Sequence, residues 1–189
     1  MFKILLYSFT LILSLVGTAL AAGADSADTY GLGRPVPAEE IVAWDIDVRP
    51  DGRGLPEGEG SVQQGAKIFA EKCAFCHGAS GVEGPFDVLV GRIPDDAFPF
   101  GRESGTVKTI GNYWPYATTV FDYINRAMPF NAPGSLEASE VYALVAYILH
   151  LNDIVPANAV LSQENLPAIT MPARHRFVLD DRRGGLEVR

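Results

Sequence analysis

The chain has 189 residues, of which 48% are apolar, and its 15 basic and 23 acidic side chains give a formal net charge of −8. This length suits one core domain with flanking segments, and the apolar fraction argues against wholesale disorder. The acidic balance excludes a nucleic-acid-binding role, which needs a basic footprint.

Residues 1–21 have the features of a secretory signal peptide. Lys3 supplies a positive start, residues 4–20 form an uncharged apolar stretch, and Ala-Leu-Ala at 19–21 is a small-x-small cleavage site. We therefore predict export, with no stable membrane insertion after cleavage. An uncleaved membrane anchor is the alternative, because the apolar run approaches the length that spans a bilayer.

Residues 22–60 are rich in glycine, proline and charge, and we predict an extended N-terminal arm there. A short piece at 38–46 could form one helical turn, with Trp44 and Ile46 as anchors. A floppy leader is the alternative, but Val48 and Leu55 add apolar side chains that a pure linker would lack. We expect the arm to lie on a surface.

The first clear helix begins at Ser61. Ser61 and Gln64 fit the S-x-x-Q capping box. Apolar residues then recur at helical spacing on one face, and they are Val62, Ala66, Phe69 and Cys73.

Both cysteines of the chain stand in the pentapeptide Cys73-Ala-Phe-Cys76-His77. C-x-x-C-H is the attachment signature of c-type haem. Cys73 and Cys76 would form the two thioether bonds, and His77 would be the proximal iron ligand. A disulfide, a thioredoxin-like pair and half of a zinc site are the alternatives; no βαβ pattern and no second cysteine pair accompany the motif. No internal repeat is visible, so we predict one haem.

Glycines and prolines make residues 86–114 loop-rich, and such loops often cover a haem edge. Pro115, as the first helical position, opens a predicted helix at about 116–127. A last helix is predicted at 136–151 with Ser135 as its cap. Its apolar stripe consists of Val141, Leu144, Val145, Ile148 and Leu149. Residues 152–189 are predicted to form an extended C-terminal tail.

Met128 is the predicted sixth ligand of the iron, because it lies at a helix end and is followed by Pro129. His150, His175 and Met171 are the alternatives. Without a ligand role, His150 would be a histidine at a helix C-terminus, His175 a solvated side chain and Met171 a packing contact. Ligation by histidine and methionine would raise the redox potential and leave no position for substrate.

The haem surroundings can be predicted less directly. The carbonyl of Pro85 is expected to accept a hydrogen bond from His77 Nδ1. Tyr113 and Trp114 could donate to buried propionates, which need partners. Arg92 or Lys108 could pair with propionates by charge. The alternative is that Trp114 only packs in the core and that Arg92 and Lys108 are ordinary surface residues.

Seven residues in this order resemble class I cytochromes c: Gly65, Phe69, Cys73, Cys76, His77, Pro85 and Met128. The resemblance covers residues 61–151. It implies an all-α fold of three to four main helices around one covalent haem, with the two flanking segments as extended arms. It also implies that Gly65 lets the last helix cross closely, with Leu144 and Tyr147 as partner positions.

Three stretches, residues 44–52, 107–119 and 126–136, resemble the cytochrome subunits of bacterial sulfite and sulfane (Sox-type) dehydrogenases. This resemblance implies a periplasmic electron-transfer subunit that is not an enzyme by itself. Its partners would be a molybdenum-cofactor, sulfur-oxidising subunit and a downstream respiratory cytochrome. The alternatives are a free periplasmic carrier that feeds a terminal oxidase, and a haem enzyme with a labile sixth ligand.

Overall fold

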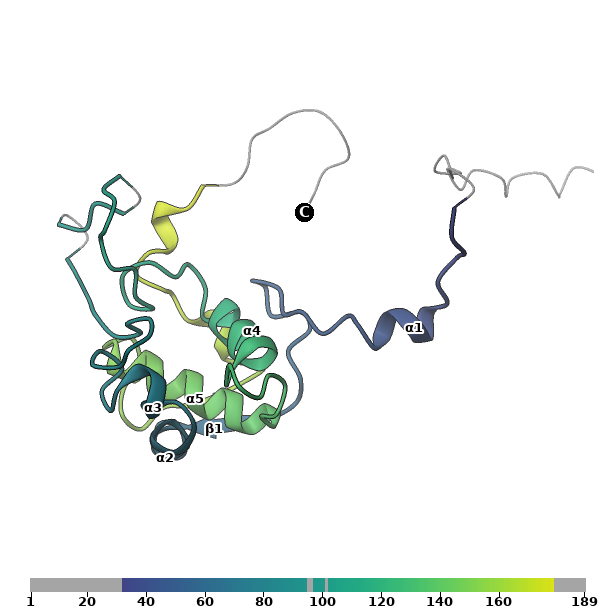
Figure 1. The fold of residues 1–189 in the computed structure, drawn as a ribbon, viewed down its shortest axis with the longest axis horizontal. Helices are drawn as coiled ribbons and strands as arrows, with labels where there is room; N and C mark the ends of the chain where they lie inside the picture. The colour runs from purple at the N-terminus through teal and green to yellow at the C-terminus, as the bar shows by residue number, and fades with distance from the viewer. Residues whose placement is uncertain (1–31, 95–96, 101, 179–189) are drawn as a thin grey trace, which may run out of the picture. The chain divides into compact units, whose positions relative to one another are not determined.

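The computed structural model describes residues 32–94, 97–100 and 102–178, so the predicted signal peptide at 1–21 lies outside the described residues. The chain divides into two units, residues 1–37 and 38–189, and the second contains every element named below. Within the described ranges, no helix is long and apolar enough to cross a membrane. The elements, shown in Figure 1, are α1 (Ala38–Val42), β1 (Glu59–Ser61), α2 (Val62–Lys72), α3 (Ala74–His77), α4 (Ala117–Ala127), α5 (Ala138–Leu151), β2 (Val160–Ser162) and two 3₁₀ turns (Leu166–Ala168 and Arg174–Arg176).

Helix α2 begins where the capping box predicts. The Ser61 hydroxyl accepts from the Gln64 backbone N–H at 3.2 Å, and the Gln64 side chain accepts from the Ser61 N–H at 2.8 Å. Two backbone donors that the helix itself leaves unpaired are thereby satisfied. The start of this helix is confirmed.

Helices α2 and α5 cross at very short range. In Figure 1, α2 is seen nearly end-on while α5 runs across the view. A Cβ placed on Gly65 would lie 1.9 Å from the Ala143 carbonyl oxygen and 2.7 Å from Tyr147 Cβ. Phe69 then meets Tyr147 edge-on, with 5.4 Å between ring centroids. Gly65 and Tyr147 thus lie as the resemblance implied. The backbone against Gly65 is that of Ala143, however, and the other predicted partner position, Leu144, is buried in the core.

Two predicted helix starts are wrong. Tyr116 is the N-cap of α4, so Pro115 precedes the helix and is not its first residue. The cap of α5 is Glu137 and not Ser135, because the Glu137 carboxylate and the Glu140 carboxylate cap each other's backbone N–H groups. The apolar stripe of α5 is confirmed, with each of its predicted members at most 4% exposed.

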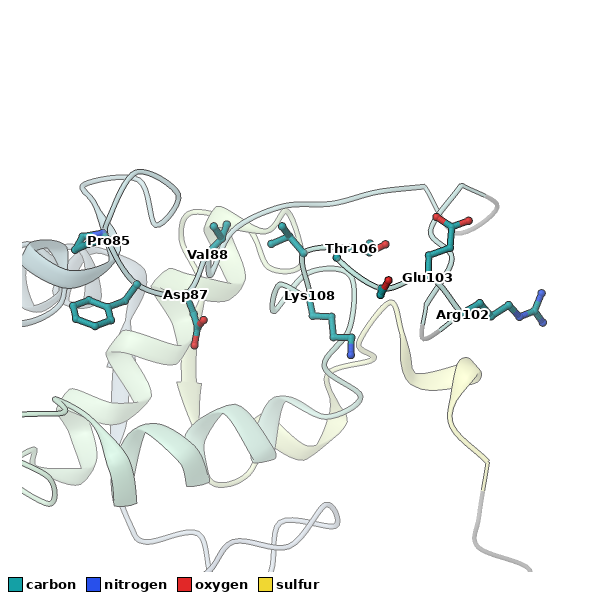
Figure 2. A pocket seen from close by; sticks show the side chains of 11 residues that line it. Pro85, Asp87, Val88, Arg102, Glu103, Thr106 and Lys108 are labelled. Carbon is teal, nitrogen blue, oxygen red and sulfur yellow. The ribbon is translucent and has the colours of Figure 1, made fainter.

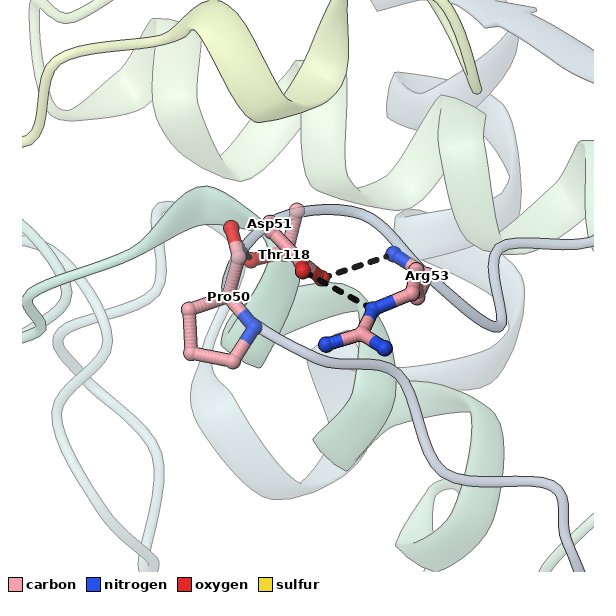
Figure 3. Close-up of polar contacts among 4 residues, drawn as sticks. All are labelled: Pro50, Asp51, Arg53 and Thr118. Atoms are coloured by element: carbon pink, nitrogen blue, oxygen red, sulfur yellow. Dashed lines mark hydrogen bonds and ion pairs between the residues drawn. The ribbon is translucent and has the colours of Figure 1, made fainter. Parts of the chain in front are cut away.

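The N-terminal segment is anchored at a different place from the one predicted. Trp44 and Ile46 are 86% and 53% exposed, so they are not anchors. Val48 is buried instead, and its N–H donates to Asp122 Oδ1 on α4 at 2.9 Å. The Thr118 hydroxyl of the same helix donates to the Pro50 carbonyl at 3.2 Å. Figure 3 labels both residues. The chain joins the core from residue 48 onward.

The segment after α5 also belongs to this core. Strand β2 pairs antiparallel with β1, with Gly60 opposite Leu161. Four apolar residues beyond α5 are buried with the helices: Leu161, Leu166, Met171 and Ala173. The predicted limits 61–151 are therefore too narrow, and the predicted tail is packed as far as residue 173. The fold remains mostly helical, with one small two-stranded sheet.

Candidate functional site

Cys73 precedes the single turn of α3 and Cys76 lies within it, directly after α2. The backbone N–H groups of Cys76 and His77 both donate to the Cys73 carbonyl at 3.0 Å, which holds the pentapeptide in a tight turn. Both cysteines are half-buried free thiols. Burial raises the pKa of Cys73 to about 11, so this thiol lies in an apolar setting that suits a thioether bonded to an apolar ring.

His77 is oriented by a backbone carbonyl, but not by the predicted one. Its Nδ1 lies 2.8 Å from the Asp87 carbonyl oxygen. A carbonyl only accepts, so Nδ1 carries the proton and Nε2 keeps its lone pair for a metal. The prediction of Pro85 as the acceptor is wrong by two residues.

The backbone around Gly84 explains this shift. A Cβ on Gly84 would lie 2.0 Å from the Cys76 carbonyl oxygen, and the Phe86 N–H donates to that same oxygen at 3.2 Å. The loop is thereby pressed against the pentapeptide before it reaches the His77 ring. Pro85 is exposed and lines a hollow between residues 85–88 and 102–108, which Figure 2 shows.

Met128 packs on the same hydrophobic core as Cys73. It ends α4 as the C-cap, with its N–H donating to the Ile124 carbonyl at 3.1 Å. Its side chain is half-buried against the hydrophobic core, and Cys73 packs against the same core from the end of α2. Met128 and Cys73, which are far apart in the sequence, therefore pack on one core.

The three alternative ligands lie in other surroundings. Met171 is 1% exposed within the core. The Nδ1 of His150 lies 3.1 Å from the Val155 carbonyl oxygen, just beyond the end of α5. His175 is exposed.

Tyr113 and Trp114 lie next to each other but in different surroundings. Tyr113 stacks on Phe100 with 5.0 Å between centroids, and Lys108 Nζ lies 4.8 Å from the Tyr113 ring centroid. Trp114 packs against the core and meets Tyr123 edge-on at 5.7 Å. Arg92 is drawn toward α5, where its Nη1 donates to the Asn152 carbonyl at 3.4 Å. The propionate roles of these residues stay predictions.

Asn152 is a site-supporting residue that the sequence analysis missed. It is completely buried at the end of α5. Its Oδ1 accepts from the Gly91 N–H at 3.0 Å, and its Nδ2 donates to the carbonyls of Ile148 at 2.9 Å and Leu89 at 3.3 Å. The loop that follows the His77 partner Asp87 is thereby tied to the last helix. An asparagine directly after an apolar stripe was the available signal.

Replacing Asn152 with leucine is expected to lower the free energy of unfolding by about 2 kcal/mol. The substitution leaves the half-buried Gly91 N–H without its partner, whereas the Ile148 and Leu89 carbonyls keep the backbone N–H groups of Asn152 and Ile110. An unsatisfied group of this kind typically costs about 1–3 kcal/mol. Urea unfolding of the haem-loaded protein measures this loss. Asn131→Ala, in an exposed loop, is the matched control and should change stability by less than about 0.5 kcal/mol. Equal midpoints for the two variants would contradict the role of Asn152.

The donor set fits a covalently bound haem. Two unpaired thiols lie on one turn, an imidazole next to them has its second nitrogen fixed by a carbonyl, and a thioether packs on the same core. These are the groups that attach haem c and hold its iron from both sides. Cys73 and Cys76 would carry the ring, and His77 and Met128 would be the axial ligands.

Comparison with known proteins agrees with this chemistry. Residues 60–148 match the family described as cytochrome C oxidase, cbb3-type, subunit III. A thiosulfate dehydrogenase from Psychrobacter arcticus is 32% identical over 120 residues, which are 59% of this chain and 33% of that protein. A chain in the crystal structure of the sulfane dehydrogenase SoxCD from Paracoccus pantotrophus is 42% identical, with a TM-score of 0.68.

The extent of these matches differs. This chain spans only a third of the thiosulfate dehydrogenase. The similarity to the SoxCD chain covers 82% of this chain and 74% of that one. That share of 189 residues is about 155 residues, which is more than the predicted haem domain at 61–151 contains.

Proposed function

This chain belongs to the class I cytochromes c, and we propose that it is the mono-haem, electron-accepting subunit of a periplasmic, molybdenum-dependent dehydrogenase that oxidises sulfite or sulfane sulfur. One observation carries the proposal: the similarity to a sulfane dehydrogenase chain extends at 42% identity well beyond the haem domain. A likeness in haem attachment alone would support only a generic carrier.

The residues of the site suit a carrier and not a catalyst. Haem c, when bound, supplies a single-electron redox couple. His77 and Met128 would both hold the iron of that haem, which would leave no position at the iron for a sulfur substrate. The hydrogen bond from His77 Nδ1 to the Asp87 carbonyl fixes the ring and raises the basicity of the ligand. Substrate oxidation would therefore take place on the molybdenum subunit, and a downstream respiratory cytochrome would receive the electrons.

The edge of the haem would be held by polar groups from the loop before α4. Tyr113 and Trp114 offer an O–H and an N–H, and in the described part of the chain neither group has a hydrogen-bond partner. Lys108, over the Tyr113 ring, could add a positive charge near a propionate. Pro85, on the exposed side of the loop that carries Asp87, would border the same region.

A second function is favoured by the relative from Psychrobacter arcticus, which is a thiosulfate dehydrogenase. If Met128 left the iron during turnover, the chain could itself oxidise thiosulfate. A free carrier that feeds a terminal oxidase is a further alternative, with the same haem chemistry.

Reduction of the purified, haem-loaded chain distinguishes these functions. We expect one haem per chain, and reduction by sulfite or a sulfane-sulfur substrate only when the purified molybdenum subunit is added. Reduction by thiosulfate without that subunit would favour the enzyme. Isolation of the chain always alone, with no electron transfer from the molybdenum subunit, would contradict the proposal and favour the free carrier.

A further inference from the structure

A short segment before the core exposes four large apolar side chains. We call residues 41–46 the apolar arm; its members Ile41, Val42, Trp44 and Ile46 are 51%, 72%, 86% and 53% exposed. Single exposed apolar residues are ordinary on protein surfaces. Four within six residues, bordered by charge, are typical of a protein-binding site.

The apolar arm has a defined backbone and a fixed point of attachment. The N–H groups of Trp44 and Asp45 both donate to the Ile41 carbonyl at 2.9 Å, which ends α1 in a tight turn. Two residues after the arm, the Val48 N–H is bound to Asp122 on α4. The chain that follows the arm is thus bound to α4, the helix that ends at Met128, and a protein bound to the arm would be tethered to the element that carries the predicted sixth ligand.

The apolar residues of the arm lead along the chain to Val48, which is buried in the core. From Trp44 to Val48 apolar residues alternate with Asp45 and Asp47. Trp44 lies in the turn, and residues 45–49 follow it; in an extended chain alternate side chains, here those of Ile46 and Val48, lie on the same side. Val48 uses that side to enter the core of its own chain, whereas Trp44 and Ile46 have no such cover in the described structure. Of these three apolar residues, one is covered by this chain, and Trp44 and Ile46 remain for a second protein.

We propose that the apolar arm is the docking element for the molybdenum subunit, with Trp44 as its main anchor. This inference rests on the proposed function and adds the surface that joins the two proteins. Buried tryptophans are prominent among the residues that dominate binding energy at interfaces.

The charges near the arm favour this partner over a second copy of the chain. Four carboxylates border the apolar residues: Glu39, Glu40, Asp45 and Asp47. In a symmetric pair of arms the same acidic surface would face itself, in a chain whose net charge is already −8. Like charges across an interface oppose association. The occupant should therefore present an apolar groove with basic side chains at its rim.

The test is the affinity of the full, haem-loaded chain for the purified molybdenum subunit. The double variant Trp44→Ala/Ile46→Ala removes two exposed side chains and leaves Val48 in place. We expect its Kd to rise about thirtyfold or more. The matched control is Val160→Ala/Val178→Ala, which truncates two residues that are 46% and 91% exposed elsewhere; its Kd should change less than threefold.

Electron transfer separates this inference from the proposed function. With saturating amounts of the double variant, reduction by the molybdenum subunit should reach the wild-type rate, because the haem site is unchanged. Asp45→Asn/Asp47→Asn should slow association and weaken its dependence on salt. Wild-type Kd for the double variant, with normal electron transfer, would overturn the docking role and leave the function intact. Self-association of the wild type that the double variant loses would assign the arm to a second copy instead.

Discussion

Met128→Ala is expected to lower the midpoint potential of the haem by on the order of 0.1 V or more, within the roughly 0.8 V that axial ligands span. The thioether stabilises the reduced iron, so its loss favours the oxidised state and opens the sixth position. The near-infrared band of the oxidised protein that reports methionine–iron ligation should also disappear. Redox titration and the absorption spectrum measure the two effects.

Met171→Leu is the matched control for this prediction. Met171 is the other methionine placed by the fold, and its side chain is buried in the core. Leucine keeps its volume, so we expect a stability loss below about 1.5 kcal/mol and an unchanged potential. An unchanged spectrum in Met128→Ala would show that Met128 is not the ligand. Loss of the band in Met171→Leu would assign the ligand to the C-terminal segment.

Gly65→Val is expected to lower the free energy of unfolding by about 4 kcal/mol, at or beyond the upper end of what overpacking usually costs. Even the first added carbon would lie 1.9 Å from the Ala143 carbonyl oxygen, which is backbone and cannot rotate away. Helices α2 and α5 would have to separate, and the contact of Phe69 with Tyr147 would be lost with them. Urea unfolding of the haem-loaded protein gives the magnitude.

Gly65→Ala tests the same close approach with a smaller side chain, and Ala70→Val is the matched control for adding a larger side chain to α2. In an isolated helix, alanine is more favourable than glycine by about 1 kcal/mol. A destabilised Gly65→Ala would therefore report the crossing and not the helix propensity. Ala70 is exposed on the same helix, and valine there should cost less than about 1 kcal/mol. A Gly65→Ala variant more stable than the wild type would refute the close approach of α2 and α5.

Features with a short sequence signal were predictable from the sequence. The capping box at Ser61 and the apolar stripe of α5 both depend on residues three or four positions apart, and both are present in the structure. The pentapeptide likewise brings its thiols and imidazole together within one turn. Such patterns are visible because their interacting groups are near neighbours along the chain.

The sequence by itself therefore determined the haem chemistry, the helical class and the crossing of the first and last main helices. Tertiary structure alone decided that Asp87 supplies the carbonyl for His77, that Val48 and not Trp44 meets the core, and that Asn152 ties a loop to α5. It also decided that β1 pairs with β2, about a hundred residues away. These outcomes depend on which backbone groups a distant segment leaves unpaired. No spacing along the chain encodes that, because a buried donor or acceptor takes whichever partner the fold brings within reach.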